Sequence, residues 1–197
     1  MKVLAFAASS SKKSINKQLV SYASSLLAEV NLQVEILDLN DYELPLFSED
    51  REAELGQPQL AQDFLTKIGE SDAVIISFAE HNGSYTVAYK NTFDWASRIN
   101  PKVFQDKPMV FLATSPGPGG ASSVLATAIS SAPFFDGEVI ASLSLPGFYE
   151  NFDSEQGRIT NDEINRQLIS TVNKLIERKP ELQRIELQQA DLKQTSL

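Results

Sequence analysis

Two hydrophobic periods alternate along most of this chain. Short runs that are apolar throughout, or at every second position, predict strands. Five such runs occur, at 3–8, 33–39, 73–78, 108–114 and 138–145. Segments with apolar residues every three to four positions follow them and predict helices. These helical segments lie at 15–30, 58–68, 88–99, 121–132 and 160–179. The alternation predicts a doubly wound α/β domain, with a parallel sheet between two layers of helices.

Capping residues and a proline mark several helix ends. Ser14 is a suitable N-cap for the first helix, and residues 160–163 have the spacing of a capping box before the last one. Pro180 is expected to end that last helix, because proline lacks a backbone donor. We therefore predict one domain at 1–179 and a polar, weakly helical tail at 180–197.

The second strand and the segment after it are less regular. In that strand we expect Val34, Ile36 and Leu39 to face the core. Residues 40–57 are polar and acidic and contain proline, which predicts a long loop with a helical turn near Glu52.

The composition limits the classes of partner. The chain has 197 residues, enough for one domain with a sizeable core. Its 17 basic and 26 acidic side chains give a formal charge of −9, which argues against a nucleic-acid partner. The lack of cysteine excludes disulfides and thiolate chemistry. No apolar run is long enough for a signal-peptide core or a membrane span, so we expect a cytoplasmic protein without a membrane partner.

The stretch after the third predicted strand, residues 79–95, reads A-E-H-N-G-S-Y-T-V-A-Y-K-N-T-F-D-W. Asn82 and Gly83 form a turn pair, because both tolerate positive φ, and a helical period follows them. Within that period we expect Phe93 and Trp95 to be core or subunit-contact residues. In a parallel sheet such a polar loop lies at the carboxyl end of its strand, where ligands bind.

The loop after the first predicted strand is rich in donors at the start of a helix. Hydroxyl, amide and ammonium groups there suit a phosphate monoester, whose charge the helix dipole also favours. These groups belong to Ser9, Ser10, Ser11, Lys12, Ser14 and Asn16. A dinucleotide-binding G-x-G-x-x-G is absent, since no glycine precedes Gly56, and a phosphorylation receiver would need carboxylates here. A hydrolytic triad is disfavoured, because His81 is the single histidine and no G-x-S-x-G elbow occurs.

Residues 79–95 resemble the P-E-Y-N-G-S…L-K-N…D-W signature of the NAD(P)H-dependent FMN reductase family, which includes quinone, chromate and azo-dye reductases. The agreeing residues are Glu80, Asn82, Gly83, Ser84, Lys90, Asn91, Asp94 and Trp95. Ala79 replaces the family's Pro, His81 its Tyr and Tyr89 its Leu.

The first loop resembles the same family's G-S-x-R-x-x-S-x-N phosphate motif. Ser9, Ser14 and Asn16 match it, whereas Ala8 replaces the Gly and Ser11 the Arg. The second change removes a forked cationic contact to phosphate, for which Lys12 or Lys13 is the candidate replacement.

The resemblance implies a flavodoxin-like three-layer α/β/α fold with a five-stranded parallel sheet of order 2-1-3-4-5. It also implies FMN as cofactor, NADPH or NADH as electron donor, and a quinone, free flavin or similar small molecule as acceptor. A homodimer or dimer of dimers would use the helix at 88–99. The implied FMN-binding residues are Ser9, Ser11, Ser14, Ile15, Asn16, Glu80, His81, Asn82, Gly83, Ser84, Ser115, Gly119 and Gly120.

Two other functions stay open at this point. Ala8 and Ser11 would also suit a flavin-free protein that binds a ligand or partner on the same scaffold. A one-electron carrier like flavodoxin is the third reading, although its usual phosphate loop contains an internal glycine that is missing here.

Overall fold

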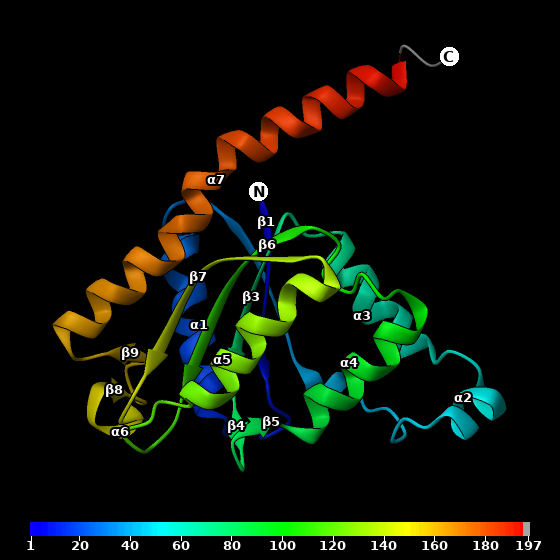
Figure 1. The fold of residues 1–197 in the computed structure, drawn as a ribbon. Helices are drawn as coiled ribbons and strands as arrows, with labels where there is room; N and C mark the ends of the chain where they lie inside the picture. Colours follow the sequence, from blue (N-terminus) through cyan, green and yellow to red (C-terminus); the bar gives the residue numbers. More distant parts are fainter. Residues whose placement is uncertain (195–197) are drawn as a thin grey trace.

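A parallel sheet of five strands lies at the centre of the computed structural model, which describes the backbone of residues 1–194 and the side chains of residues 1–178 (Figure 1). The strands are β1 (Lys2–Ala8), β2 (Gln33–Leu37), β3 (Ala73–Phe78), β6 (Lys107–Thr114) and β7 (Gly137–Leu145). They lie in the order β2-β1-β3-β6-β7, and every neighbouring pair is parallel. Counted among themselves these strands have the order 2-1-3-4-5, which confirms the predicted flavodoxin-like α/β fold.

Two layers of helices cover the sheet, and each buries its own apolar cluster. One layer contains α1 (Ile15–Ala28) and α7 (Asp162–Gln194), whose Leu19 and Leu168 are fully buried. The other contains α3 (Gln59–Gly69), α4 (Val87–Ile99) and α5 (Ser122–Ser131). Ser14 caps α1 as predicted.

The remaining elements are short. They are the 3₁₀ turns η1 (Leu39–Asp41) and η2 (Ala132–Phe135), α2 (Glu49–Leu55), α6 (Phe148–Asn151), and the hairpins β4–β5 (Glu80–His81, Ser84–Tyr85) and β8–β9 (Phe152–Asp153, Arg158–Ile159). The helix α2 confirms the helical turn expected near Glu52.

The prediction for the second strand is wrong in two details. The strand ends at Leu37, and Ile36 is 46% exposed, whereas Leu37 and Leu39 are buried. β2 is the edge strand of the sheet, so α1 covers only part of one face and leaves Ile36 outside it. Leu39 does face the core, but from η1, after the chain has left the sheet.

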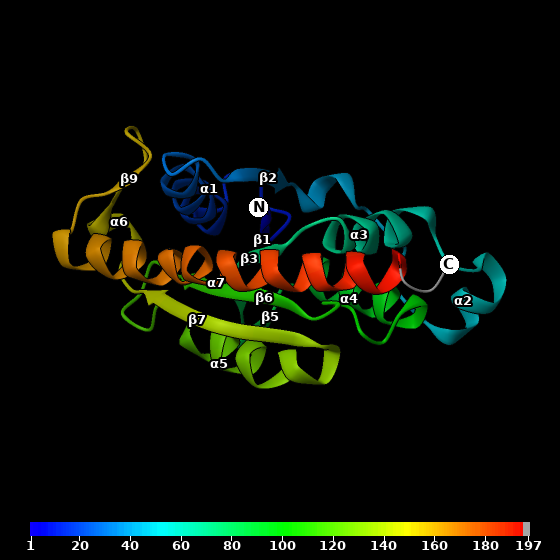
Figure 2. The same cartoon turned by 90° about the horizontal axis from the view of Figure 1, so that it is seen from above.

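We predicted from the sequence that the last helix ends at Pro180, and this prediction is wrong. α7 continues to Gln194; its first half lies beside β7, and its last turns extend away from the sheet in Figure 1, although they overlap the domain when seen from above in Figure 2. A proline inside a helix removes one donor and bends the axis, but the turns on either side keep their own hydrogen bonds. The division into a domain at 1–179 and a tail at 180–197 stays a prediction, and 195–197 lie outside the described residues.

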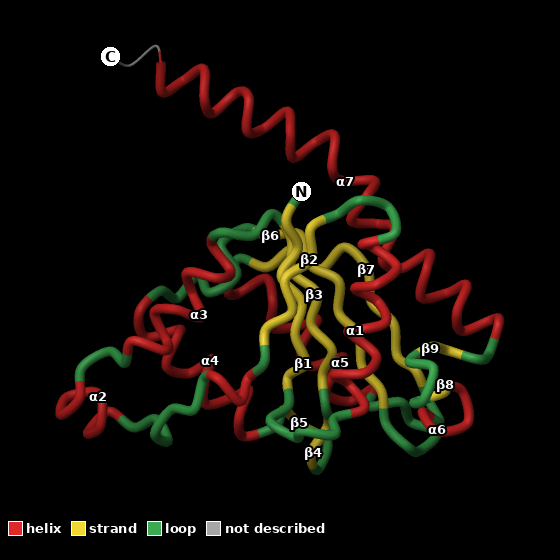
Figure 3. The backbone as a smooth tube through the Cα atoms, turned by 180° about the vertical axis from the view of Figure 1, so that it is seen from behind, coloured by secondary structure: helices red, strands yellow, loops and turns green. Residues whose placement is uncertain are grey.

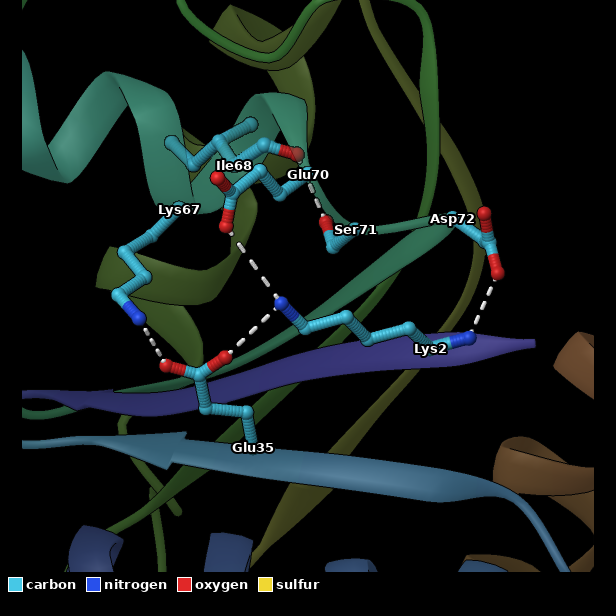
Figure 4. A network of polar contacts seen from close by, with 7 residues as sticks. All are labelled: Lys2, Glu35, Lys67, Ile68, Glu70, Ser71 and Asp72. Atoms are coloured by element: carbon cyan, nitrogen blue, oxygen red, sulfur yellow. Dashed lines mark hydrogen bonds and ion pairs between the residues drawn. The ribbon is translucent and has the colours of Figure 1, made fainter.

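A polar network joins the amino ends of β1, β2 and β3 (Figure 4). Glu35 accepts from Lys67 Nζ at 2.6 Å and faces Lys2 Nζ at 3.1 Å, and these two ammonium groups, Lys67 first, lower the pKa of its carboxyl. The backbone N–H of Lys2 donates to Asp72 Oδ2 at 2.6 Å. The network fixes the strand starts, at the edge of the sheet opposite the loops considered below.

The loops that follow the strands gather at the other edge of the sheet, the lower edge in Figures 1 and 3. The hairpin β4–β5 and the helix α6 lie at this edge as well. Among the described residues, no helix is long and apolar enough to cross a membrane. Among the side chains that the structure describes, no cluster of acidic and histidine groups is suited to hold a metal ion.

Candidate functional site

The loops after β1, β3 and β6 meet in one pocket of about 240 Å³ at the carboxyl ends of the strands. A larger hollow of about 520 Å³ adjoins it along the outer side of α1 and shares Lys13 and Ser14 with it. The residues that line the pocket are Ser9, Ser11, Lys13, Ser14, Ile15, Asn16, Ala79, Glu80, His81, Thr114, Ser115, Pro116 and Tyr149. This is the edge at which doubly wound sheets bind their ligands.

Two buried serines of the first loop have hydroxyl groups that can donate a hydrogen bond to a ligand. Ser9 and Ser14 are each only 7% exposed. Ser9 Oγ accepts from the backbone N–H of Ser11 at 3.2 Å, and Ser14 Oγ accepts from that of Lys17 at 3.3 Å. Because both oxygens act as acceptors in these bonds, both O–H groups can donate into the pocket.

Backbone N–H groups of α1 and one ammonium group are further donors at this pocket. Ile15 and Asn16 begin α1, so their backbone N–H groups have no partner within the helix. Lys13 lines the pocket and, among the described residues, forms no ion pair. Ser11, at the position of the family's Arg, lines the pocket with a hydroxyl only. This donor set fits a phosphate, although it lacks the forked guanidinium contact.

The side chain of Asn16 forms hydrogen bonds within the protein core. It is 2% exposed. Its Nδ2 donates to the carbonyl of Thr114 at 3.1 Å, and its Oδ1 accepts from Ser77 Oγ at 2.8 Å and from the backbone N–H of Thr114 at 3.0 Å. These bonds tie the start of α1 to the ends of β3 and β6. Asn16 therefore positions the loop after β1, and only its backbone N–H is left for a ligand.

The predicted Asn82-Gly83 turn closes the two-residue hairpin β4–β5. Its φ values of 53° and 77° are those of a type I′ turn, which matches the twist of the flanking strands. The hairpin brings His81 to the pocket, whereas Asn82, Gly83 and Ser84 are exposed and lie outside the lining.

The carboxylate of Glu80 also forms a hydrogen bond within the protein. Its Oε2 accepts from the backbone N–H of Val124, in the first turn of α5, at 2.8 Å. A carboxylate at a helix N-terminus satisfies a free donor and complements the helix dipole. Glu80 thus connects the hairpin to α5, and its backbone remains for a ligand.

The two glycines of the third loop shape it and do not line the pocket. Gly119 is exposed, and Gly120 has a φ of +56°. A Cβ on Gly120 would lie 2.3 Å from Ser144 Oγ and 3.0 Å from the backbone nitrogen of Pro146. Gly120 therefore lets the loop pack against the end of β7.

Replacing Gly120 with alanine is expected to lower the free energy of unfolding by about 2 kcal/mol, because it combines an unfavourable φ with an overlap. Urea denaturation measures this change. Gly117→Ala is the matched control, since its added Cβ meets no atom within 4 Å, and it should stay within about 0.5 kcal/mol of the unmodified protein. Equal effects of the two substitutions would contradict the packing role of Gly120.

The helical part of the family signature lies away from the pocket. Asn91 Nδ2 and Trp95 Nε1 both donate to the carbonyl of Pro45, at 3.1 and 2.7 Å. Lys90 and Asp94 form an ion pair of 2.6 Å on the surface of α4. Trp95 is fully buried, so the prediction of a core residue is confirmed. This part of the signature holds the loop before α2 against α4.

Four lining residues were missed by the sequence reasoning: Ala79, Thr114, Pro116 and Tyr149. The first three adjoin the ends of β3 and β6. Tyr149, which is 69% exposed, follows β7. The signal that could have found it is topological, because the fifth strand ends at the same edge of the sheet as the others.

Comparisons with known proteins found similar sequences and structures. A family model described as NADPH-dependent FMN reductase matches residues 1–147. The chain is 35% identical over 125 residues to an NADPH:quinone oxidoreductase of Arabidopsis thaliana, an alignment that covers 62% of each protein. It is 27% identical over 179 residues to a 2-hydroxy-1,4-benzoquinone reductase of a Burkholderia species, covering 88% of this chain and 93% of the relative.

Among solved structures, the fold is similar to that of FerB, a flavoenzyme NAD(P)H:(acceptor) oxidoreductase from Paracoccus denitrificans. The TM-score is 0.70 at 26% identity, with 89% of this chain and 95% of FerB covered.

Proposed function

The chain belongs to the NADPH-dependent FMN reductase family, and on this basis we propose that it is an FMN-dependent oxidoreductase. When bound, FMN supplies the redox chemistry, accepting hydride from NADPH or NADH and passing electrons to a quinone, free flavin or similar small acceptor. Relatives named as quinone reductases support a quinone as the acceptor class.

The observation that carries the proposal is the donor set at the start of α1, inside a pocket that two further loops complete. In this proposal Ser9, Ser14 and Lys13 hold the phosphate together with the first N–H groups of the helix. The backbone of Glu80 and His81 holds the polar edge of the flavin ring. Hydride transfer needs close stacking of two rings and no protein acid, so the chain's task is placement around an open ring face.

We also propose a homodimer or a dimer of dimers, in which the face at the start of α4 takes part. Leu46 and Val87 are 61% and 67% exposed and border a hollow of about 450 Å³. Exposed apolar side chains grouped in this way are typical of subunit contacts. Light scattering of the purified chain should give at least twice the mass of one chain, and a monomer would overturn this part.

Steady-state kinetics with NADPH and p-benzoquinone test the activity. A ping-pong reaction predicts parallel lines in double-reciprocal plots, at rates well above those of NADPH with free FMN alone. Rates no higher than with free FMN would contradict the proposal. Uptake of electrons from dithionite in two separate one-electron steps would instead favour the one-electron carrier.

Replacing Ser11 with arginine is expected to tighten FMN binding about tenfold, because a guanidinium adds a charge and two parallel hydrogen bonds to phosphate. Flavin fluorescence titration at fixed salt measures the affinity. Ser10→Arg is the matched control, since Ser10 is exposed and lines the hollow beside α4 instead. A similar gain from both substitutions would show a general charge effect and not a phosphate contact at position 11.

A further inference from the structure

A second cavity, of about 190 Å³, lies between α4 and α5 beside the β4–β5 hairpin. It shares no lining residue with the pocket at the strand ends. Its walls are mainly aromatic, and Phe93 and Phe135 meet edge to face there with ring centroids 4.7 Å apart. The polar side chains of Lys90, Asp94 and Ser97 belong to its lining as well.

The size of the cavity limits what it can hold. An engineered cavity of about 150 Å³ with apolar walls stays dry and binds benzene. One six-membered ring with a small substituent therefore suits a cavity of about 190 Å³, whereas two fused rings are too large. Aromatic walls favour an aromatic guest, because edge-to-face contacts between rings add to the burial of apolar surface.

One wall carries a tyrosine hydroxyl that has no hydrogen-bond partner within the described part of the chain. Tyr89 is 3% exposed, and its hydroxyl forms no hydrogen bond to any residue in the described part of the chain. The neighbouring Tyr85, whose ring centroid is 5.2 Å away, is hydrogen-bonded to Ser131 Oγ at 3.1 Å. Burial raises the pKa of Tyr89 well above that of an ordinary tyrosine, so its hydroxyl is a neutral donor. Because this hydroxyl has no partner in the described part of the protein, it is free to donate a hydrogen bond to a ligand oxygen.

We propose that this cavity binds a small monocyclic phenol, whose ring fills the apolar walls and whose oxygen accepts a hydrogen bond from the Tyr89 hydroxyl. Tyr89 is also one of the positions at which the chain departs from the family signature, which has Leu there. A leucine would fill the same wall without offering a donor. The departure thus supplies an unpartnered hydroxyl, which favours a phenol over a plain hydrocarbon ring.

The cavity is connected to the pocket through the hairpin. Tyr85 lines the cavity and pairs in register with Glu80, which lines the pocket and caps α5. The two sites nevertheless share no residue, so binding of phenol does not require that the chain use FMN.

Titration of the full chain with phenol, toluene and 2-naphthol, followed by ¹H–¹⁵N NMR with and without excess FMN, tests the proposal. Phenol is expected to bind with a Kd below about 1 mM and to shift residues around the cavity, whereas 2-naphthol should not bind there. Tyr89→Phe should weaken phenol about fivefold and leave toluene unchanged, because one neutral hydrogen bond is lost. It should not lower the stability of the unliganded chain, since the hydroxyl has no protein partner to lose.

Tyr22→Phe is the matched control. Its hydroxyl donates to Asn165 Oδ1 at 2.8 Å, outside the cavity, so this variant should lose stability and keep its affinity for phenol. Absence of phenol binding, shifts confined to the strand-end pocket, or equal losses for phenol and toluene in Tyr89→Phe would each overturn the proposal.

Discussion

Replacing Asn16 with alanine is expected to lower the free energy of unfolding by about 3 kcal/mol. The substitution removes three hydrogen bonds and leaves Ser77 and Thr114, which are 0% and 1% exposed, without their partner. Each buried polar group that loses its partner costs about 1–3 kcal/mol. Because the same bonds hold the start of α1 against β3 and β6, FMN affinity should fall with stability. Urea denaturation measures the first effect and flavin fluorescence the second.

Asn173→Ala is the matched control for this prediction. Asn173 is a half-buried residue of α7 that makes no hydrogen bond with its side chain in the described part of the chain. Its replacement should change stability by about 0.5 kcal/mol or less. A comparably small change for Asn16→Ala would show that Asn16 does not join the three elements.

Replacing Ser14 with glycine is expected to weaken FMN binding about tenfold to a hundredfold. One hydrogen bond from a hydroxyl to a charged phosphate is worth about 1.5–3 kcal/mol. Glycine is chosen because it is tolerated at an N-cap, so the stability of α1 should change by only a few tenths of a kcal/mol. Riboflavin, which lacks the phosphate, should bind equally well to both forms.

Ser48→Gly controls for the loss of a capping hydroxyl. Ser48 caps α2, where its Oγ accepts from the backbone N–H of Arg51, and it does not line the pocket. Its replacement should leave FMN affinity unchanged. If Ser14→Gly weakened riboflavin as much as FMN, the phosphate would not lie at Ser14.

The strands and the site edge could be predicted because both follow from local patterns. Apolar runs such as 73–78 specify buried strands, and parallel strands necessarily bring their carboxyl ends to one edge. This is why Ser9, His81 and Ser115, far apart in sequence, line one pocket. The exposure of Ile36 could not be predicted, since it depends on how far α1 reaches over the edge strand.

Side-chain roles were harder to predict than positions. Asn16 and Glu80 belong to motifs that suggest ligand contact, yet their side chains bond to Thr114 and Val124. Which groups a polar side chain meets depends on the packing of distant elements, and the local sequence contains no signal for it. The unpartnered hydroxyl of Tyr89 is a tertiary feature of the same kind.

The central claim, that the chain binds FMN and reduces it with a nicotinamide nucleotide, is tested most directly by absorbance. The purified chain is mixed with excess FMN, separated from unbound flavin and treated with NADPH without oxygen. We predict absorbance near about 450 nm that is retained with the protein and bleaches when NADPH is added. A colourless protein that holds no FMN would contradict the claim, and the serine at position 11 would then suit a ligand-binding protein without a flavin.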